Sequence, residues 1–422
     1  MDKYGRIVIY IIISLFSLLA CNSQKDGKRV RSEVDALLIS KFDSIYTYPE
    51  KMKTCFREAQ KKTSDSAAYY KLELFAGYCL YLQGYPDSAL HINQKVLTFC
   101  KQHPETSALE GMCWNHRSSL LQGMNQRDSS IACLHHAYNA TYRSHDRLEL
   151  ENICINLADA YRQKGELVQA SKYYRKALWV VDSLKSEYVK FSIYMGLAQT
   201  YADLHNFTLA HRYFDLAEQV PEQRLEYENY HFLNSKGNCL YYEEKYAEAL
   251  PYFQQAYQVV KPFNQPSFNA LVEANLGEIY MLLGKHDSAH YYLDKSCSVL
   301  MNDSTANEEV LFYLNSLQGA LALRENKLEA ANRYLSKPYN PQRIGPSYIY
   351  LHNKRLMEYY AQKKDFEKAY NYKNIVEQYD DSMRNVRNIN NINEIDYRYS
   401  QDTTLLKKDI LISNDKTRLS RQ

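Results

Sequence analysis

Residues 152–182 read NICINLADAYRQKGELVQASKYYRKALWVVD, and this stretch decides the fold. Leu157, Ala158 and Tyr161 recur at the three- and four-residue spacing that places side chains on one face of an α-helix. Gly165 follows directly and is typical of a turn between two helices. The first half of the stretch therefore predicts one amphipathic helix that ends at a tight turn.

The second half of the stretch predicts another helix. Ala170, Tyr174 and Ala177 share one face of it. Small residues on both helices allow their backbones to approach closely, and the aromatic rings then fill the space between neighbouring pairs. The stretch as a whole predicts a pair of antiparallel helices.

The same pattern recurs along most of the chain. The position equivalent to this small residue of the first helix falls at 77, 118, 158, 198, 237, 277, 318 and 357. The steps between these positions are 41, 40, 40, 39, 40, 41 and 39 residues. Regular spacing of this kind indicates a repeat array in which each unit packs mainly on its neighbours.

The spacing L-[GA]-x2-Y-x3-G-x4-A-x3-[FY]-x2-A resembles the tetratricopeptide repeat. The resemblance implies an all-α fold, a right-handed superhelical solenoid of antiparallel helix pairs. The usual repeat of this family has about 34 residues, and the additional residues here lie mostly between one pair and the next. We expect eight such repeats over 67–380, a degenerate helix pair over 31–66 and a helical tail over 381–422.

Composition supports helices and excludes several other classes. The 422 residues include only 13 Gly and 10 Pro, too few for the many turns of a β-sandwich. The 40 Tyr are about 9.5% of the chain, and several fall at the repeat's own aromatic sites. A net charge of +3 gives no basic stripe for nucleic acid, and 45% hydrophobic residues argue against disorder.

The N-terminus has the pattern of an export signal. Lys3 and Arg6 precede an apolar run over 7–20, which suits a signal peptide better than a membrane span. The run ends in Leu-Leu-Ala-Cys, which resembles the bacterial lipobox and implies lipidation of Cys21. We expect a signal peptide over 1–20, a linker over 21–30 and a location in the bacterial cell envelope, lipid-anchored. An ordinary signal peptide or an anchor helix with an incidental Cys is the alternative.

The remaining residues offer no convincing catalytic or metal-binding set. Eight further Cys lack any C-x-x-C or zinc spacing, so we interpret them as buried small side chains, with one or two disulfides as the alternative. His286 and His290 have i,i+4 spacing but no third ligand. No hydrolase, kinase or nucleotide-binding motif occurs. We therefore expect no enzyme, no cofactor and no metal.

The resemblance implies a concave surface lined by the first helix of each pair. Its groove-facing positions are Asn115, Asn152, Asp159, Arg162, Gln199, Asn234, Asn238, Tyr241, Tyr242 and Asn315, together with Gln122, Asp203, Glu278 and Glu358. Asparagine is a mediocre helix former, so its recurrence suggests amides that bind the backbone of an extended peptide. The tyrosines would add aromatic contacts and Arg162 would hold a carboxylate. The alternative is that these are tolerated, solvated positions between adjacent helices.

The tail over 385–422 predicts one helix with a narrow apolar stripe that begins at Val386. It could dock on the last repeat as a cap, or form a homodimeric coiled coil through 385–412. It also resembles the juxtamembrane helix of longer envelope regulators, in which a membrane span and an output domain follow. We expect either a shortened relative of these or further sequence beyond residue 422.

The sequence leads to three functional hypotheses. The first is an envelope-anchored scaffold or adaptor that binds a protein or peptide in the concave face. The second is the sensor portion of a membrane signalling or transcriptional regulator. The third is a glycan-capturing outer-membrane lipoprotein, which ranks last because the long insertions of that type are missing.

Overall fold

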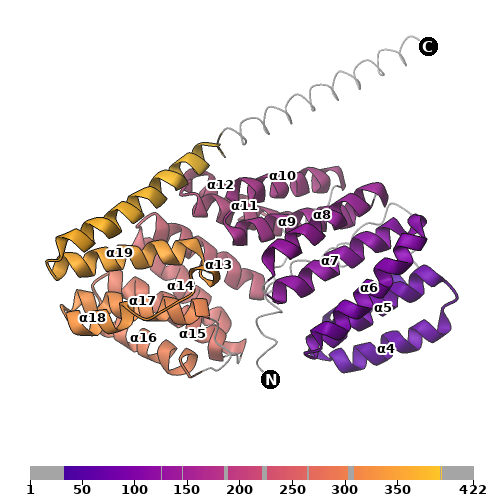
Figure 1. Cartoon of the computed structure of the whole chain (residues 1–422), viewed down its shortest axis with the longest axis horizontal. Helices are drawn as coiled ribbons and strands as arrows, with labels where there is room; N and C mark the ends of the chain where they lie inside the picture. The colour runs from indigo at the N-terminus through magenta and orange to yellow at the C-terminus, as the bar shows by residue number, and fades with distance from the viewer. Residues whose placement is uncertain are drawn as a thin grey trace, which may run out of the picture.

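The structure is a computed structural model that describes residues 33–389 and 391, except 125, 145, 185–188, 221–225, 264–265 and 303–307. The predicted signal peptide, the linker and Cys21 lie outside these residues. The described chain is helical and forms no strand, which confirms the all-α solenoid (Figure 1).

The helices follow one another in antiparallel pairs. The N-terminal pair is α3 (Glu33–Thr47) with α4 (Pro49–Lys62). The next pairs are α5 (Ser66–Leu82) with α6 (Pro86–Gln102), α7 (Ser107–Gly123) with α8 (Arg127–Ser144), α9 (Arg147–Lys164) with α10 (Leu167–Leu184), and α11 (Lys190–Asp203) with α12 (Phe207–Glu218). Then come α13 (Glu226–Tyr242) with α14 (Tyr246–Val260), α15 (Pro266–Leu282) with α16 (His286–Leu300), α17 (Glu308–Arg324) with α18 (Leu328–Leu335), and α19 (Pro346–Gln362) with a C-terminal helix over 366–389.

Small residues let the two helices of a pair approach closely. A Cβ atom at Gly237 would lie 3.1 Å from the ring of Phe253, and one at Gly277 would lie 2.6 Å from Leu293. Ala158 and Ala198 occupy the equivalent sites and are fully buried. The predicted role of these positions is therefore correct, because a larger side chain would push the two helices apart.

The turns inside seven of the described pairs show the register of the repeat. A residue with positive φ stands at 84, 165, 205, 244, 284, 326 and 364. In six of these turns it lies seven residues after the predicted small residue. The exception is Asn326, which lies seven residues after Gly319. The small residue of that pair is therefore Gly319, whose Cβ would lie 2.6 Å from Leu335, and the assignment to Gln318 was wrong.

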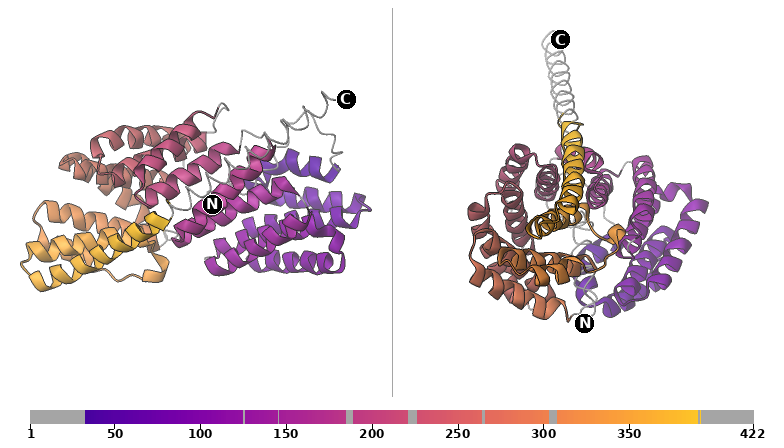
Figure 2. Two further views of the ribbon diagram at one scale, coloured as in Figure 1. Left: turned by 90° about the horizontal axis from the view of Figure 1, so that it is seen from above. Right: turned by 60° about the vertical axis from the view of Figure 1, so that its left-hand side comes forward.

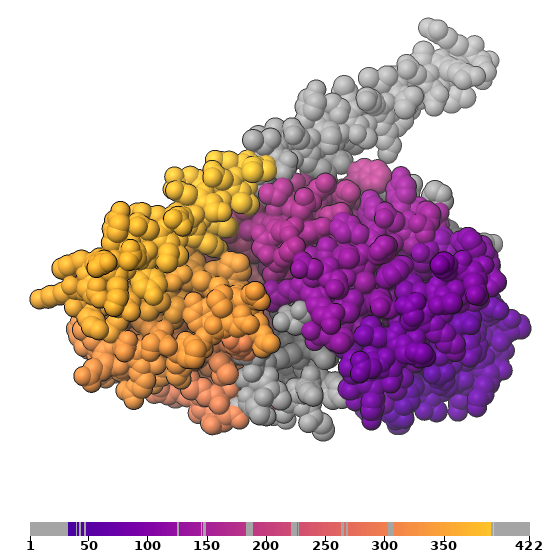
Figure 3. All heavy atoms as spheres, viewed as in Figure 1, coloured from indigo at the N-terminus to yellow at the C-terminus, as the bar shows by residue number. Residues whose placement is uncertain are grey.

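The helix pairs curve into a superhelix, and the C-terminal helix returns across its inner side (Figure 2). The Arg387 Nη1 donates to the His205 carbonyl at 3.3 Å, and the Asn206 Nδ2 donates to the Asn391 Oδ1 at 2.6 Å. Met383 and Val386 pack against the main core. Figure 3 shows this helix meeting the surface of the middle repeats.

This helix differs from the predicted tail in two ways. It runs unbroken through residue 380, so residues 381–389 of the predicted tail continue the second helix of the last pair. Its distal half contacts the turn between α11 and α12 rather than capping the last repeat. Val386, the first residue of the stripe proposed for a dimer, packs inside its own chain. Most of 385–412 lies outside the described residues.

Two further features bear on the sequence expectations. All eight cysteines after Cys21 are free thiols, and six of them, including Cys79, Cys154 and Cys239, are buried. Within the described ranges no helix is long and apolar enough to cross a membrane. The same residues bring together no three His, Cys, Asp or Glu side chains that could hold a metal ion.

Candidate functional site

The first helices of successive pairs form the inner row of the superhelix. Contacts connect α5 to α7, α7 to α9, α9 to α11, α11 to α13, α15 to α17 and α17 to α19. Side chains on this row can therefore reach the equivalent side chains one repeat away. This geometry places most of the predicted groove residues on one continuous concave face.

Asn115 and Asn152 lie at the N-terminal end of this face, and both are buried. Both hydrogen-bond to the carboxyl group of Glu149, and Asn115 does so at 3.1 Å. The Asn115 Oδ1 also accepts from the Asn156 Nδ2 at 2.9 Å. Burial raises the pKa of Glu149 to about 7, with Asp146 adding to the effect and the two amides opposing it. These two asparagines therefore bind a carboxyl group of their own chain.

Arg162, which was predicted to hold a carboxylate of a bound partner, pairs with the Asp203 side chain of the next repeat. The distance from its Nη1 to the Asp203 Oδ2 is 3.4 Å, and both side chains stay more than a quarter exposed. The Arg162 Nε has no hydrogen-bond partner among the described residues. Asp159 accepts a hydrogen bond from the buried Tyr174 hydroxyl, so it connects the two helices of its own pair.

Polar pairs across repeats continue along the row. The described contacts are Gln122 Nε2 to Gln163 Oε1 at 2.8 Å, Gln199 Nε2 to Ser235 Oγ at 2.6 Å and Asn275 Nδ2 to Asn234 Oδ1 at 3.3 Å. In each pair the partners stand 36 to 41 residues apart in sequence, close to one repeat. Some of the recurring Asn and Gln side chains therefore connect neighbouring first helices to one another.

Side chains at the centre of the concave face have fewer hydrogen-bond partners within the described residues. Asn238 is half-buried, and its amide makes no hydrogen bond with the described residues. Tyr242 is also half-buried and stacks on His205 with 5.9 Å between ring centroids. Burial, with Asp203 nearby, raises the pKa of the Tyr242 hydroxyl well above its usual range, so it remains a neutral donor.

Glu278 forms a buried polar centre toward the C-terminal end. Its carboxylate accepts from the Tyr241 hydroxyl at 2.9 Å and from the Tyr313 hydroxyl at 2.8 Å, and it pairs with Arg355. Arg355 also donates to the Ser316 Oγ at 2.7 Å. Four first helices, α13, α15, α17 and α19, are thereby connected through a single carboxylate.

Asn315 does not belong to the concave face. Because the register of α17 is set by Gly319, the groove-facing residues of that helix are Tyr313 and Ser316. Asn315 instead lines a cavity shared with α18 and the following loop. Its assignment to the groove was wrong, since a shift of one residue rotates a helical side chain by about 100°.

Several residues of this face were not predicted as site residues. Glu149, Ser235, Tyr313 and Arg355 all pair with predicted groove residues. Most of these residues lie about one repeat length from their partners in the sequence. That spacing could have been used to predict the pairs. The return of the C-terminal helix toward His205 had no counterpart in the sequence pattern.

The geometry can be compared with known proteins. The model of the family described as "Tetratricopeptide repeat" matches residues 153–187, which cover most of α9, all of α10 and the residues just after them. The chain therefore contains a tetratricopeptide repeat and has the helical-repeat solenoid fold of that family. No curated protein matches its sequence.

Solved structures show the same fold over most of the chain. A Rap protein complexed with competence and sporulation factor has a TM-score of 0.60 at 16% identity, covering 84% of this chain and 100% of that one. The apo form of the quorum sensor NprR from B. thuringiensis has a TM-score of 0.58 at 14% identity, covering 82% and 99%. Aspartyl phosphate phosphatase F from Bacillus subtilis has a TM-score of 0.54 at 16% identity, covering 90% and 94%.

At these identities the likeness concerns the fold. Together with the repeat match, this fold supports a scaffold for contact with a protein or peptide. The repeat family is generally non-enzymatic.

Proposed function

We propose that this protein is an envelope-anchored scaffold or adaptor that binds an extended protein segment in the centre of its concave face. The observation that supports this most directly is that the half-buried Asn238, one helical turn before Tyr242, makes no amide hydrogen bond with the described residues. An amide offers both a donor and an acceptor, which is the pattern that a peptide backbone requires. The neighbouring tyrosine hydroxyl and ring add polar and aromatic contact.

The charges near this centre are balanced within the chain. Arg162 is paired with Asp203, and Glu278 with Arg355. A partner bound here therefore gains little from net charge and more from hydrogen bonds and ring contacts.

Anchoring belongs to the proposal as well. The lipobox-like Leu-Leu-Ala-Cys at residues 18–21 supports lipidation of Cys21 and a location in the bacterial cell envelope. Metabolic labelling with an alkyne fatty acid would test this point. The wild-type chain should be labelled, and Cys21→Ser should not be.

A photo-crosslinking amino acid at position 238 tests the binding site. Position 332 is the matched control, because Asn332 is an exposed asparagine of the outer helix α18. We expect a partner to be captured from envelope membranes at 238 and not at 332. Asn238→Ala should lower recovery of that partner at least fivefold, whereas Asn332→Ala should not. Equal capture at both positions would contradict the proposal.

The contact of the C-terminal helix favours a second candidate, the sensor portion of a membrane regulator. Arg387 reaches His205, and the ring of His205 stacks on Tyr242. A segment bound at Tyr242 would therefore alter the surface on which this helix rests. Hydrogen exchange of residues 366–389, measured with and without the captured partner, tests this candidate. Unchanged protection would leave only the scaffold.

A further inference from the structure

The second helix of the α17–α18 pair is unusually short. It has 8 residues, whereas the second helices of the six preceding pairs have 12 to 18. Pro338 explains the early end, since proline disfavours helical backbone in the residue before it. The first half of α17 therefore lacks the cover that a full second helix gives elsewhere.

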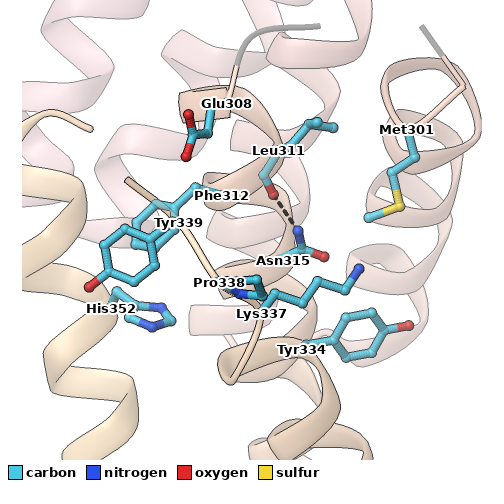
Figure 4. Close-up of a pocket in the computed structure, with 10 residues that line it drawn as sticks. All are labelled: Met301, Glu308, Leu311, Phe312, Asn315, Tyr334, Lys337, Pro338, Tyr339 and His352. Atoms are coloured by element: carbon cyan, nitrogen blue, oxygen red, sulfur yellow. Dashed lines mark hydrogen bonds between the residues drawn. The ribbon is translucent and has the colours of Figure 1, made fainter. Parts of the chain in front are cut away.

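A loop replaces the missing turns and leaves a cavity of about 380 Å³ between α16, α17, the loop and α19 (Figure 4). Two carboxylates at the start of α17 hold this loop. The Glu308 side chain accepts from the Asn340 backbone N at 2.6 Å, and Glu309 accepts from the Gly345 N at 2.8 Å. The cavity is therefore preformed, and its size lies at the lower end of small-molecule sites.

One end of the cavity is an aromatic wall. The centroid of the Phe312 ring lies 4.4 Å from that of Tyr339 and 4.7 Å from that of His352. Burial lowers the pKa of His352 to about 4, so its ring is neutral near pH 7. Its Nδ1 also lies 3.1 Å from the Ser316 Oγ. The three rings present a neutral surface suited to an apolar or aromatic group.

The opposite end of the cavity is cationic. Lys337 is exposed, its ammonium lies 5.7 Å from the centroid of the Tyr334 ring, and it forms no ion pair with the described residues. The carboxylate of Glu308 is already occupied by Arg343 at 3.5 Å and by the Asn340 N–H. Among the described residues that line this cavity, the charge left uncompensated is therefore positive.

Asn315 lies between the two ends (Figure 4). Its Nδ2 donates to the Leu311 carbonyl at 2.7 Å, which fixes the orientation of the amide. Its Oδ1 is buried and has no hydrogen-bond partner among the described residues. Buried carbonyl oxygens are nearly always paired, so a group that fills this cavity and carries a hydroxyl or N–H would supply the missing donor.

We propose that this cavity binds a small organic carboxylate that has an aromatic or apolar body and a hydroxyl or N–H donor next to the carboxylate. The carboxylate pairs with the Lys337 ammonium, the donor bonds to the Asn315 Oδ1, and the ring packs on Phe312, Tyr339 and His352. This site lies apart from the concave centre and does not depend on the function proposed there.

Four probes separate the three parts of this recognition. 3-Phenyllactate has the ring, the hydroxyl and the carboxylate. Phenyllactamide lacks the charge, 3-phenylpropionate lacks the hydroxyl, and lactate lacks the ring. We expect 3-phenyllactate to bind the full chain with a Kd in the low millimolar range or tighter, measured by saturation-transfer NMR. Each of the other three should bind about fivefold or more weakly.

Two lysines give a matched pair of variants. Lys337→Ala should weaken 3-phenyllactate about fivefold or more and leave phenyllactamide unchanged. Lys285→Ala is the control, because Lys285 is also exposed and lies 5.9 Å from the centroid of Tyr280, but it does not line the cavity. Asn315→Asp should also weaken 3-phenyllactate, through repulsion between two carboxylates.

Three results would overturn the proposal. The first is no binding of 3-phenyllactate at 10 mM, and the second is equal binding of the acid and the amide. The third is an equal effect of Lys337→Ala and Lys285→Ala. Both lysines are exposed, so neither variant should disturb folding, and a thermal melt of each variant checks this directly. If 3-phenylpropionate binds as well as 3-phenyllactate, Asn315 has no part in recognition and that element of the proposal fails.

Discussion

The rings of Tyr201 and Tyr213 lie parallel, with centroids 5.5 Å apart and an angle of 1° between their planes. The same arrangement joins Tyr161 to Tyr173, Tyr280 to Tyr292 and Tyr360 to Tyr372, at 5.5 to 5.6 Å and 7 to 9°. Each stack connects the first helix of a pair to the second. The high tyrosine content therefore serves helix packing in part, because a stacked pair adds to the stabilisation from buried area.

Tyr201→Phe tests what the hydroxyl groups of these stacks contribute. The Tyr201 hydroxyl accepts from the buried Arg175 Nη1 at 3.1 Å. We expect this variant to lower the free energy of unfolding by about 1–3 kcal/mol, because a buried donor loses its acceptor. Urea denaturation measures the change.

Tyr280→Phe is the control for this prediction. It stands at the same place in another repeat, but its hydroxyl accepts from the exposed Gln254 amide at 3.0 Å. Tyr280→Phe should lower the free energy of unfolding by about 0.5 kcal/mol or less, as for other surface contacts. An equal loss in both variants would show that burial of the donor is not the cause.

Gly277→Ala tests the close approach of the two helices in a pair. The added Cβ would lie 2.6 Å from the Leu293 Cγ. Although alanine is the better helix former, we expect a net loss of about 1–3 kcal/mol in the free energy of unfolding from overpacking. In a Leu293→Ala background the same substitution should stabilise. A double-mutant cycle by urea denaturation gives the coupling, and a coupling near zero would contradict this account.

Much of the fold was predictable because it follows from local patterns. The 40-residue spacing located the eight helix pairs that follow the N-terminal pair, since each pair needs close contact at one point. The register failed at Gln318, where Gly319 stands beside it and the pattern alone favours neither residue. The return of the C-terminal helix to His205 was not predictable, since it depends on how far the whole superhelix turns.

The sequence could place the candidate residues on the first helices, but it could not predict which hydrogen-bond and ion-pair partners they have. Sequence spacing placed Asn234 and Arg162 correctly on the first helices. It could not show that Asn275 and Asp203, one repeat further along, already bind them. Such pairs depend on the distance and rotation between neighbouring repeats, and the repeat pattern contains neither quantity. Asn238 and Tyr242 remain candidate peptide-binding residues because both are only half-buried.

Glu151→Gln should change how stability depends on pH. Glu151 is buried, and neither of its carboxyl oxygens has a hydrogen-bond partner among the described residues. Burial, and then the nearby Glu149, raise its pKa from 4.5 to about 8. The folded state thus holds this proton more tightly than the unfolded chain. Its contribution to the free energy of unfolding falls as pH rises from about 4.5 to about 8 and is constant above that range.

We therefore expect the free energy of unfolding of Glu151→Gln to increase relative to that of the wild type as pH rises. The difference in the free energy of unfolding between pH 4 and pH 9 should be on the order of a few kcal/mol. Urea titrations at both pH values measure it. Glu248→Gln, at an exposed position of α14, is the control and should show no such difference. A Glu151→Gln effect that is the same at both pH values would contradict the predicted protonation.

Arg355→Leu should destabilise the C-terminal repeats strongly. Arg355 and Glu278 form a buried ion pair with side chains that are 9% and 7% exposed. Removing the guanidinium leaves the carboxylate in the interior with only the Tyr241 and Tyr313 hydroxyls as donors. Breaking such a pair costs about 3–5 kcal/mol. Urea denaturation measures this loss, and hydrogen exchange of α19 locates it.

Two further variants complete the test of this ion pair. Arg343→Leu removes a guanidinium that is 63% exposed and 3.5 Å from Glu308, so it should cost about 1 kcal/mol or less. Glu278→Gln combined with Arg355→Leu removes both charges and should cost less than Arg355→Leu alone, because no unpaired charge remains buried. If Arg355→Leu and Arg343→Leu were equally costly, the polar centre at Glu278 would not connect the first helices energetically. The shared carboxylate would then reflect only their proximity.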